Sequence, residues 1–390
     1  MRLNTLLLAP GLALAVAGAA GAQTPITIGM ITTLSGPAGY LGEDIRDGFN
    51  LAVEMNGGQL GGRAVTLVAE DDAMRPANAR QIAERMLAEG VEIFTGIIFA
   101  NIAFATVPEV LESGALYISA NTASASFAGE GCHANYFVSS WQDDSQGESA
   151  GAMAQALGFQ NALLIAPNYQ AGHETIEAFQ RTFEGEIVGE IFTSLDQTDF
   201  AAEIARIRAA RPDVVYPFQP GGLGIAFLRQ YHQSGLLDEI PLVLHPASLN
   251  PVTLAALGEA AEGLYVSSHW NSDLPNPTNE AFMAAWRAAY GDRPATWYAA
   301  QGYDVALMVA AGMSNLADEG FDLAAFRQGI LDGPVDSVRG GFTLGPNQHP
   351  VQDWYAVRAE RDSEGNLALV TQNRVLEAHG DIYAGDCRID

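Results

Sequence analysis

Short apolar segments alternate with amphipathic segments along most of this chain, and this order constrains the fold more than any other feature. The first apolar segment is ITIGMIT at residues 26–32, and RAVTLVAEDD (63–72) and VEIFTGI (91–97) follow it. Helical patterns lie between these segments, and paired glycines at 57 and 58 end the first predicted helix. Apolar strands separated by amphipathic helices are typical of a parallel sheet covered on both faces. The sequence therefore predicts an α/β fold.

A second series of the same kind begins after Trp141. Its predicted strands are NALLIA, EIVGEIF, PDVVYPF, IPLVLH and EGLYVSS, with helices near 171–183, 199–210 and 223–234. Further helices are predicted near 279–290, 296–313 and 321–333, followed by the strands GFTLG, VQDWYAVRAE and LALVTQN. Two successive series predict two Rossmann-like lobes with parallel sheets rather than one large sheet.

The N-terminus has the pattern of a secretory signal peptide. Arg2 precedes the apolar run LLLAPGLALAVAG, and AGA ending at Ala22 fits a cleavage site. No later stretch is long and apolar enough to cross a bilayer. We therefore expect a signal peptide over residues 1–22 and a mature protein, beginning at Gln23, that is exported to the periplasm without membrane insertion.

The charge of the chain restricts its partners. It carries 46 acidic residues against 19 cations, all of them arginine, for a net charge of −27. So acidic a surface repels nucleic acid and anionic membranes. We therefore expect neither as a partner.

The two cysteines, Cys132 and Cys387, lie in the glycine-containing segments GEGCHAN and AGDCRID. In an oxidising compartment the simplest prediction is a disulfide that ties the C-terminal tail to the body of the protein. Two unpaired thiols are the alternative, because pairing depends on geometry that the sequence does not give.

Candidate binding residues follow the predicted strands. In open parallel sheets, ligands bind outside the carboxyl ends of the strands, and the loops there are rich in Ser, Asn, Gly and aromatic residues. Ser35 and Asn121 are able to cap helices or to bind a ligand. A single aromatic residue usually belongs to a core, but four at strand ends favour a pocket wall. These four are Tyr40, Trp141, Tyr169 and Phe218.

Common enzyme motifs are missing from the sequence. It contains no GxxxxGK[ST], HExxH, GxSxG or CxxC pattern. Its seven histidines are scattered, and His245, which follows a buried strand, is first interpreted as structural. We therefore expect no catalytic residue, no metal and no cofactor.

The sequence resembles the periplasmic solute-binding proteins of ABC transporters, of the branched-chain amino acid (leucine-binding, type I) class. The resemblance rests on the segment from ITIGMITTLSGPAGYLG to DDAMRPANARQIAERML, and on ISANTASASF, NYQAGHETIEAFQRTF and YAAQGYDVALMVAAGM. It spans essentially the whole mature chain. It implies two α/β lobes joined by three crossovers, near Trp141, His269 and Pro346, with a ligand between the lobes.

The predicted domains follow from these crossovers. We expect lobe 1 over residues 23–141 plus 270–345 and lobe 2 over 142–269 plus 346–375. A C-terminal tail then occupies 376–390.

The resemblance also identifies candidate ligand contacts. Family members that bind amino acids hold the carboxylate with Ser or Thr side chains, where this chain has Ala100 and Ala123, the latter next to Thr122. The acidic residue that binds the ammonium group is replaced by Ala247. Because a buried ammonium without a carboxylate partner is costly, the natural ligand is not expected to be a free amino acid.

The other candidate ligand contacts are either aromatic residues or neutral polar residues. They are the strand-end residues named above together with Phe99, Gln219 and His245. They favour an aromatic or aliphatic carboxylate, with its ring stacked and its carboxylate on backbone N–H groups and Asn121. A protonated His245 would add a positive charge. Asp143 is able to bind an amine, which keeps a free amino acid such as leucine or phenylalanine as the alternative ligand.

The resemblance implies a non-enzymatic carrier that closes around its ligand and delivers it to the permease subunits of an ABC importer. We expect it to act as a monomer. A periplasmic ligand sensor on the same fold is the rival from another class, and a neighbouring permease gene would favour the carrier. A secreted enzyme is a second rival, which turnover without a partner would favour.

Overall fold

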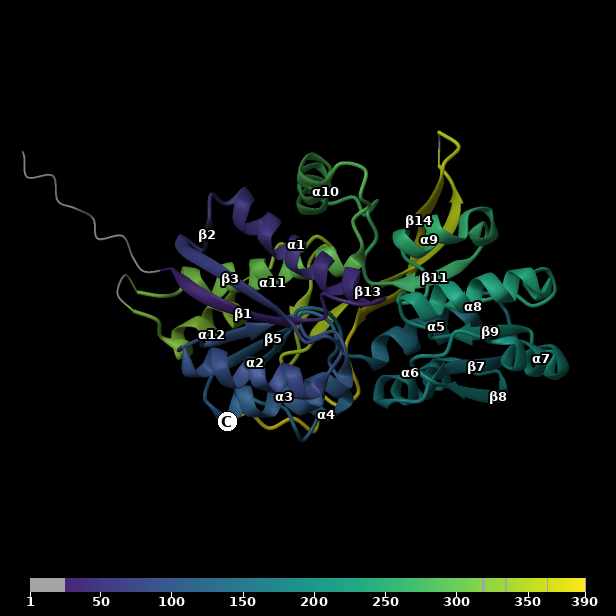
Figure 1. Cartoon of the computed structure of the whole chain (residues 1–390), viewed down its shortest axis with the longest axis horizontal. Helices are drawn as coiled ribbons and strands as arrows, with labels where there is room; N and C mark the ends of the chain where they lie inside the picture. Colours follow the sequence, from purple (N-terminus) through teal and green to yellow (C-terminus); the bar gives the residue numbers. More distant parts are fainter. Residues whose placement is uncertain (1–24, 318–319, 334, 363, 390) are drawn as a thin grey trace, which may run out of the picture.

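The computed structural model describes residues 25–317, 320–333, 335–362 and 364–389. The signal peptide predicted for residues 1–22 lies outside these ranges. Within them, no helix combines the length and the apolar character needed to cross a membrane. The chain forms two α/β lobes that lie side by side (Figure 1).

The first lobe is built on a six-stranded sheet of order β2-β3-β1-β4-β5-β6. All neighbouring strands are parallel except β2, which forms a hairpin with β3. The central strands are almost wholly buried, as their apolar sequences predicted. The strands are β1 (Ile26–Thr32), β2 (Gln59–Leu60), β3 (Arg63–Asp71), β4 (Ile93–Thr95), β5 (Leu116–Ser119) and β6 (Tyr136–Val138).

Helices cover both faces of this sheet. Helices α1 and α11 pack together on one face, and α2 and α3 lie on the other (Figure 1). The lobe comprises α1 (Gly39–Met55), α2 (Pro76–Ala88), α3 (Ala100–Glu112), α4 (Ala125–Ala128), α10 (Pro277–Tyr290), α11 (Trp297–Ser314) and α12 (Leu323–Asp332).

Two glycines allow α1 and α11 to approach closely. A Cβ atom added at Gly48 would lie 1.9 Å from the backbone oxygen of Ala299, and one at Gly302 would lie 1.9 Å from that of Ile45. Both separations are shorter than real Cβ contacts, so a side chain at either position would force the helices apart. This packing brings the N-terminus of α11, which is distant in sequence, to the end of the first lobe where β1 joins α1.

The second lobe contains parallel strands in the order β8-β7-β9, and an isolated parallel bridge between Val215 and Leu242 connects them to β10 and β11. Its helices are α5 (Asp144–Ala156), α6 (Gln170–Thr182), α7 (Ala201–Ala210), α8 (Gly222–Gln233) and α9 (Pro251–Leu257), with 3₁₀ turns at Leu236–Asp238 and Gly258–Ala261. Its strands are β7 (Asn161–Pro167), β8 (Glu186–Thr193), β9 (Val214–Pro217), β10 (Val243–Leu244), β11 (Tyr265–Ser268), β12 (Thr343–Leu344), β13 (Pro350–Arg361) and β14 (Leu367–His379).

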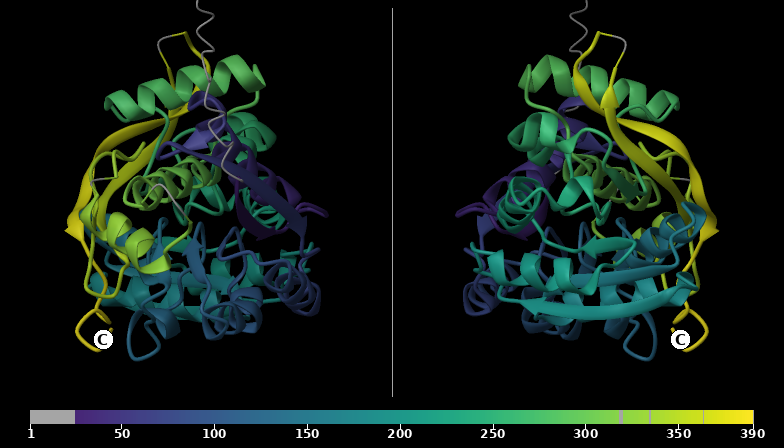
Figure 2. Two further views of the ribbon diagram at one scale, coloured as in Figure 1. Left: turned by 90° about the vertical axis from the view of Figure 1, so that its left-hand side faces the viewer. Right: turned by 90° about the vertical axis from the view of Figure 1, so that its right-hand side faces the viewer.

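The second sheet also contains antiparallel strands, a detail that the prediction of parallel sheets did not include. Strand β13 runs antiparallel to both β11 and β14, and the β13–β14 pair forms a long ribbon along one side of the molecule (Figure 2). A short chain reversal between β13 and β14 permits only antiparallel pairing, because a parallel pair needs a long crossover. Strand β14 also continues to His379, so part of the segment predicted as a tail is sheet.

The chain passes between the lobes where β6 leads to α5, where β11 leads to α10, and where α12 leads to β13. Arg339 lies at the junction of the first and third of these connections and is buried. Its Nη1 donates to the backbone oxygen of Ser140 and to Oε1 of Gln352, both at 2.6 Å, and its Nε lies 3.1 Å from Oδ2 of Asp304. The boundaries at residues 141, 269 and 345 remain predictions.

A disulfide joins Cys132, in the loop after α4, to Cys387 near the C-terminus, with 5.6 Å between their Cα atoms. The C-terminal segment also contacts the second lobe, since the Tyr383 hydroxyl donates to Oδ2 of Asp144 at 2.6 Å. The bond therefore fixes a segment that touches both lobes, and it closes a loop of 255 residues in sequence.

Replacing both cysteines by serine should lower the free energy of unfolding by about 2–4 kcal/mol, because the unfolded chain loses a long covalent loop. Equilibrium denaturant unfolding measures this change. A reductant should destabilise the wild-type protein by a similar amount and leave the C132S/C387S variant unchanged. Equal stability of the two proteins would contradict a stabilising role for the disulfide.

Candidate functional site

A cavity lies between the two lobes. Its walls come from loops and helix starts that follow strands β4, β5 and β6 in the first sheet and β7, β9 and β10 in the second, together with α1 and α11. The lining residues are Leu41, Ile98, Phe99, Ala100, Asn121, Thr122, Trp141, Asp143, Gln146, Tyr169, Ala171, Thr175, Phe218, Pro220, His245, Ala247, Trp297 and Tyr298. The position agrees with the rule that ligands bind beyond the carboxyl ends of parallel strands.

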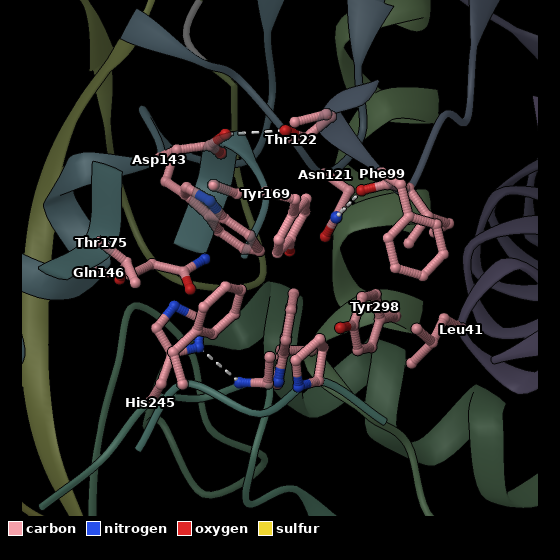
Figure 3. Close-up of a pocket in the computed structure, with 18 residues that line it drawn as sticks. Leu41, Phe99, Asn121, Thr122, Asp143, Gln146, Tyr169, Thr175, His245 and Tyr298 are labelled. Carbon is pink, nitrogen blue, oxygen red and sulfur yellow. Dashed lines mark hydrogen bonds between the residues drawn. The ribbon is translucent and has the colours of Figure 1, made fainter. Parts of the chain in front are cut away.

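Many of the predicted contact residues meet at this cavity, and most are visible in Figure 3. The predicted residues that line it are Phe99, Ala100, Asn121, Thr122, Trp141, Tyr169, Phe218, His245 and Ala247. Several aromatic pairs lie among the walls. The rings of Tyr169 and Phe218 are stacked with centroids 6.1 Å apart, and those of Trp141 and Trp297 meet edge to face at 4.8 Å.

Three predicted residues do not line the cavity. Ser35 is exposed in the loop before α1. Tyr40 is directed toward the other lobe, where its hydroxyl lies 3.4 Å from Nδ2 of Asn250. Gln219 is fully buried within the second lobe, with its Nε2 3.4 Å from Oγ1 of Thr193. The loop 35–42 therefore contributes Leu41 to the wall and Tyr40 to the contact between the lobes.

Several polar and aromatic lining residues were not predicted from the sequence. Gln146 and Thr175 lie within α5 and α6, where a single polar residue in a helical pattern carries no signal of its own. Trp297 and Tyr298 begin α11, and their place at the cavity depends on the packing of α11 on α1. Two adjacent aromatic residues at a predicted helix start are the one sequence signal that could have indicated them.

His245 is a neutral hydrogen-bond donor. Its Nδ1 accepts a hydrogen bond from the backbone N–H of Ala247 at 3.0 Å, so the proton of the neutral ring is on Nε2. Burial holds the pKa of His245 well below its usual value of 6.5. The positive charge suggested by the sequence analysis is therefore absent near pH 7, and the Nε2–H remains as a donor.

Asn121 has the opposite orientation to the one a carboxylate needs. Its Nδ2 donates to the backbone oxygen of Ile98 at 2.7 Å, while its Oδ1 is buried and has no partner among the residues described. The group it turns to the cavity is therefore an acceptor. Two oxygen acceptors repel each other, so this orientation disfavours a ligand carboxylate beside Oδ1; a carboxylate held by Asn121 stays a prediction.

Asp143 is the one carboxyl group among the lining residues. Its oxygens accept from Oγ1 of Thr122 and from the backbone N–H of Ala123, both at 2.8 Å, so the group is directed toward the first lobe (Figure 3). Burial and the nearby Glu174 raise its pKa from 3.8 to about 7. Asp143 is therefore only partly ionised near pH 7.

Helices α3 and α6 both begin at the cavity, at Ala100 and Gln170, and neither has a side chain that caps its first turn. The first N–H groups of a helix have no partner within the helix, and their dipoles favour an anion. The cavity can thus bind a carboxylate through neutral donors. No group of His, Cys, Asp and Glu suited to a metal ion occurs in the part of the chain that the structure describes.

Hydrogen bonds connect the lobes around the cavity. Oγ of Ser124 in the first lobe donates to Oε1 of Glu174 in the second at 2.5 Å. On another side, Nε1 of Trp297 lies 3.4 Å from the backbone oxygen of Pro246. Together with the Tyr40–Asn250 contact, these bonds describe a closed arrangement of the lobes.

A family model described as periplasmic binding protein matches residues 25–366 of this chain. The chain belongs to this family. It is therefore a solute-binding protein and not an enzyme, in agreement with the missing enzyme motifs. The two-lobed type I fold is shared with solved structures of ABC transporter solute-binding proteins.

Individual relatives of this periplasmic binding protein are named after, or solved with, different kinds of ligand. A Leu/Ile/Val-binding protein homologue of Brucella melitensis is 24% identical over 94% of this chain and 95% of its own. The solute-binding protein of an R. palustris ABC transporter, solved in complex with benzoate, is 28% identical with a TM-score of 0.86, over 94% of this chain and 100% of that chain. Another R. palustris protein, solved in complex with 4-hydroxybenzoate, is 22% identical with a TM-score of 0.84. The match covers 91% of this chain and 98% of that chain, and at this identity it shows the fold alone.

The Asp143→Asn variant of this binding protein should gain stability relative to wild type as the pH rises. The folded-state pKa of Asp143 is raised, so its contribution to stability is complete below pH 3.8 and is lost as the pH rises toward 7. Asparagine does not titrate and can keep the bonds to Thr122 and Ala123. We expect the difference in Tm, variant minus wild type, to grow by about 2–4 °C between pH 5 and pH 8.

Differential scanning calorimetry at several pH values measures this difference. Asp292→Asn, an exposed carboxyl in the loop before α11, is the matched control and should show a constant difference. A constant difference for Asp143→Asn as well would mean that Asp143 is ionised throughout this range.

Proposed function

We propose that this chain is the periplasmic, substrate-binding component of an ABC importer and that it binds an aromatic carboxylate of the benzoate class between its lobes. The observation that carries the proposal is the lining of the cavity. Aromatic rings form its walls, neutral groups supply its donors, and no arginine occurs among the lining residues. The chain contains no lysine.

The walls favour a flat, apolar ligand body. Tyr169, Phe218, Trp141 and Trp297 line the cavity from both lobes. An aromatic ring held between such groups buries apolar surface and gains additional stacking or edge-to-face interactions of about 0.5–1.5 kcal/mol per pair. A ligand that contacts both lobes stabilises the closed arrangement, because it makes those contacts only when the lobes meet.

The ligand carboxylate fits best on the side of His245. The Nε2–H of His245 and the amide of Gln146 lie on the same side of the cavity, opposite Asn121 (Figure 3). Helix α6, which begins at Gln170, adds backbone N–H groups from the second lobe. Such hydrogen bonds to a charged group are stronger than those between neutral groups.

The benzoate complex of the R. palustris relative supports this ligand class. The name of the Brucella relative supports a free amino acid as the alternative ligand. Asp143 is the available partner for an ammonium group, but both of its oxygens already accept hydrogen bonds and its pKa is raised to about 7. An amine-free acid avoids the cost of burying an ammonium group without a fully ionised partner.

Delivery to permease subunits follows from the proposed importer role. The closed form would be the one that the permease recognises, and the hydrogen bonds between Ser124 and Glu174 and between Tyr40 and Asn250 belong to it. Export through the signal peptide at residues 1–22, action as a monomer and the lobe boundaries given above are parts of the same proposal.

Thermal unfolding against a ligand panel tests the proposed ligand class. The mature protein is unfolded and refolded to remove bound ligand, and it is then heated with benzoate, hydroxycinnamate, aliphatic keto acids, leucine or phenylalanine. At about 100 times its Kd, a ligand adds roughly 2.7 kcal/mol to the stability of the folded state. Aromatic acids without an amine should therefore raise Tm by several degrees. A shift with leucine or phenylalanine alone would contradict the proposal.

The His245→Phe variant tests where the carboxylate lies. Phenylalanine keeps the ring that packs on Phe218 at a centroid distance of 4.3 Å but removes the Nε2–H donor. We expect the Kd for benzoate, measured by calorimetry, to rise about 10- to 100-fold. His173→Phe, at an exposed position on α6, is the matched control and should leave the Kd within about twofold. An unchanged Kd in His245→Phe would place the carboxylate elsewhere.

A further inference from the structure

Asn121 presents a buried hydrogen-bond acceptor to the cavity. Only 8% of the residue is exposed, and its Oδ1 has no hydrogen-bond partner among the described residues. In Figure 3 the amide nitrogen bonds to the backbone oxygen beside Phe99, and the amide oxygen lies on the cavity side. An unpaired buried acceptor is costly, so this atom needs a donor when the lobes are closed around a ligand.

The orientation of this amide is fixed by its neighbours. Nδ2 of Asn121 donates to the backbone oxygen of Ile98 at 2.7 Å, and a rotated amide would bring two oxygens to that distance. The backbone oxygen of Asn121 in turn accepts from Oγ of Ser140 at 2.6 Å, which anchors the residue at the end of β5. The amide of Asn121 therefore cannot rotate to place Nδ2 where Oδ1 now lies without losing the bond to Ile98.

We infer that Asn121 selects a hydroxylated aromatic carboxylate, whose ring hydroxyl donates to its Oδ1 while the carboxylate lies on the opposite side of the cavity. This inference rests on the proposed function and deepens it. Unsubstituted benzoate has only ring C–H groups to place beside Oδ1 and leaves the acceptor without a partner. A methoxy group is worse, because it brings a second acceptor toward Oδ1. Buried polar groups of this kind discriminate strongly against analogues that lack the matching group.

Calorimetric titration of the wild-type protein with benzoate, 3-hydroxybenzoate, 4-hydroxybenzoate and both methoxybenzoates tests the inference. The better hydroxybenzoate should bind at least tenfold more tightly than benzoate, and its methyl ether should bind more weakly than benzoate. Equal affinities of hydroxybenzoates and benzoate, or of a hydroxybenzoate and its methyl ether, would overturn the inference and leave the proposed function standing. Failure of every aromatic acid to bind would overturn both.

The Asn121→Leu variant assigns the preference to this residue. Leucine has a similar size and no acceptor, so the ratio of the benzoate Kd to the hydroxybenzoate Kd should fall from at least ten to about one. Asn101→Leu, an exposed position in the first turn of α3, is the matched control and should keep the wild-type ratio. A wild-type ratio in Asn121→Leu would overturn the assignment. The titrations of the wild-type protein test the donor requirement even where Asn121→Leu does not fold.

Discussion

The buried guanidinium of Arg339 joins the connections between the lobes to helix α11, and the position of the interlobe cavity depends on these contacts. It bonds to the segment that leaves the first sheet at Ser140 and to β13 of the second sheet at Gln352. Its charge is matched by Asp304 on α11, and burial lowers the pKa of Arg339 and raises that of Asp304. Burying such a pair is costly, and removing one partner alone leaves an uncompensated charge. The connections between the lobes are thus fixed relative to α11, whose first residues line the cavity.

The cavity beyond this junction contains little charge although the protein is strongly acidic. Its one carboxyl group, Asp143, is turned toward Thr122 and Ala123, and burial keeps it partly protonated near pH 7. His245 is neutral for the same reason. An anionic ligand in this environment meets oriented N–H groups instead of a cation. Closing the lobes therefore does not remove a charged protein partner from water.

Pattern and spacing predicted the parallel sheets, both lobes and the strand-end position of the cavity, because each follows from local sequence. Pairing between distant segments could not be predicted in this way. The antiparallel β13–β14 ribbon and the approach of α11 to α1 through Gly48 and Gly302 are set by tertiary contacts. The orientation of Asn121 and the tautomer of His245 depend on single hydrogen bonds to Ile98 and Ala247, which leave no trace in the sequence.

A crystal structure of the mature protein grown with 4-hydroxybenzoate would show whether an aromatic carboxylate binds between the lobes with its carboxylate on His245. We expect a ring between Trp141 and Tyr169, a carboxylate within hydrogen-bond distance of Nε2 of His245, and closed lobes with the Ser124–Glu174 bond intact. A ligand carboxylate on Asn121, an amino acid retained in its place with its ammonium group on Asp143, or a ligand outside the interlobe cavity would contradict it.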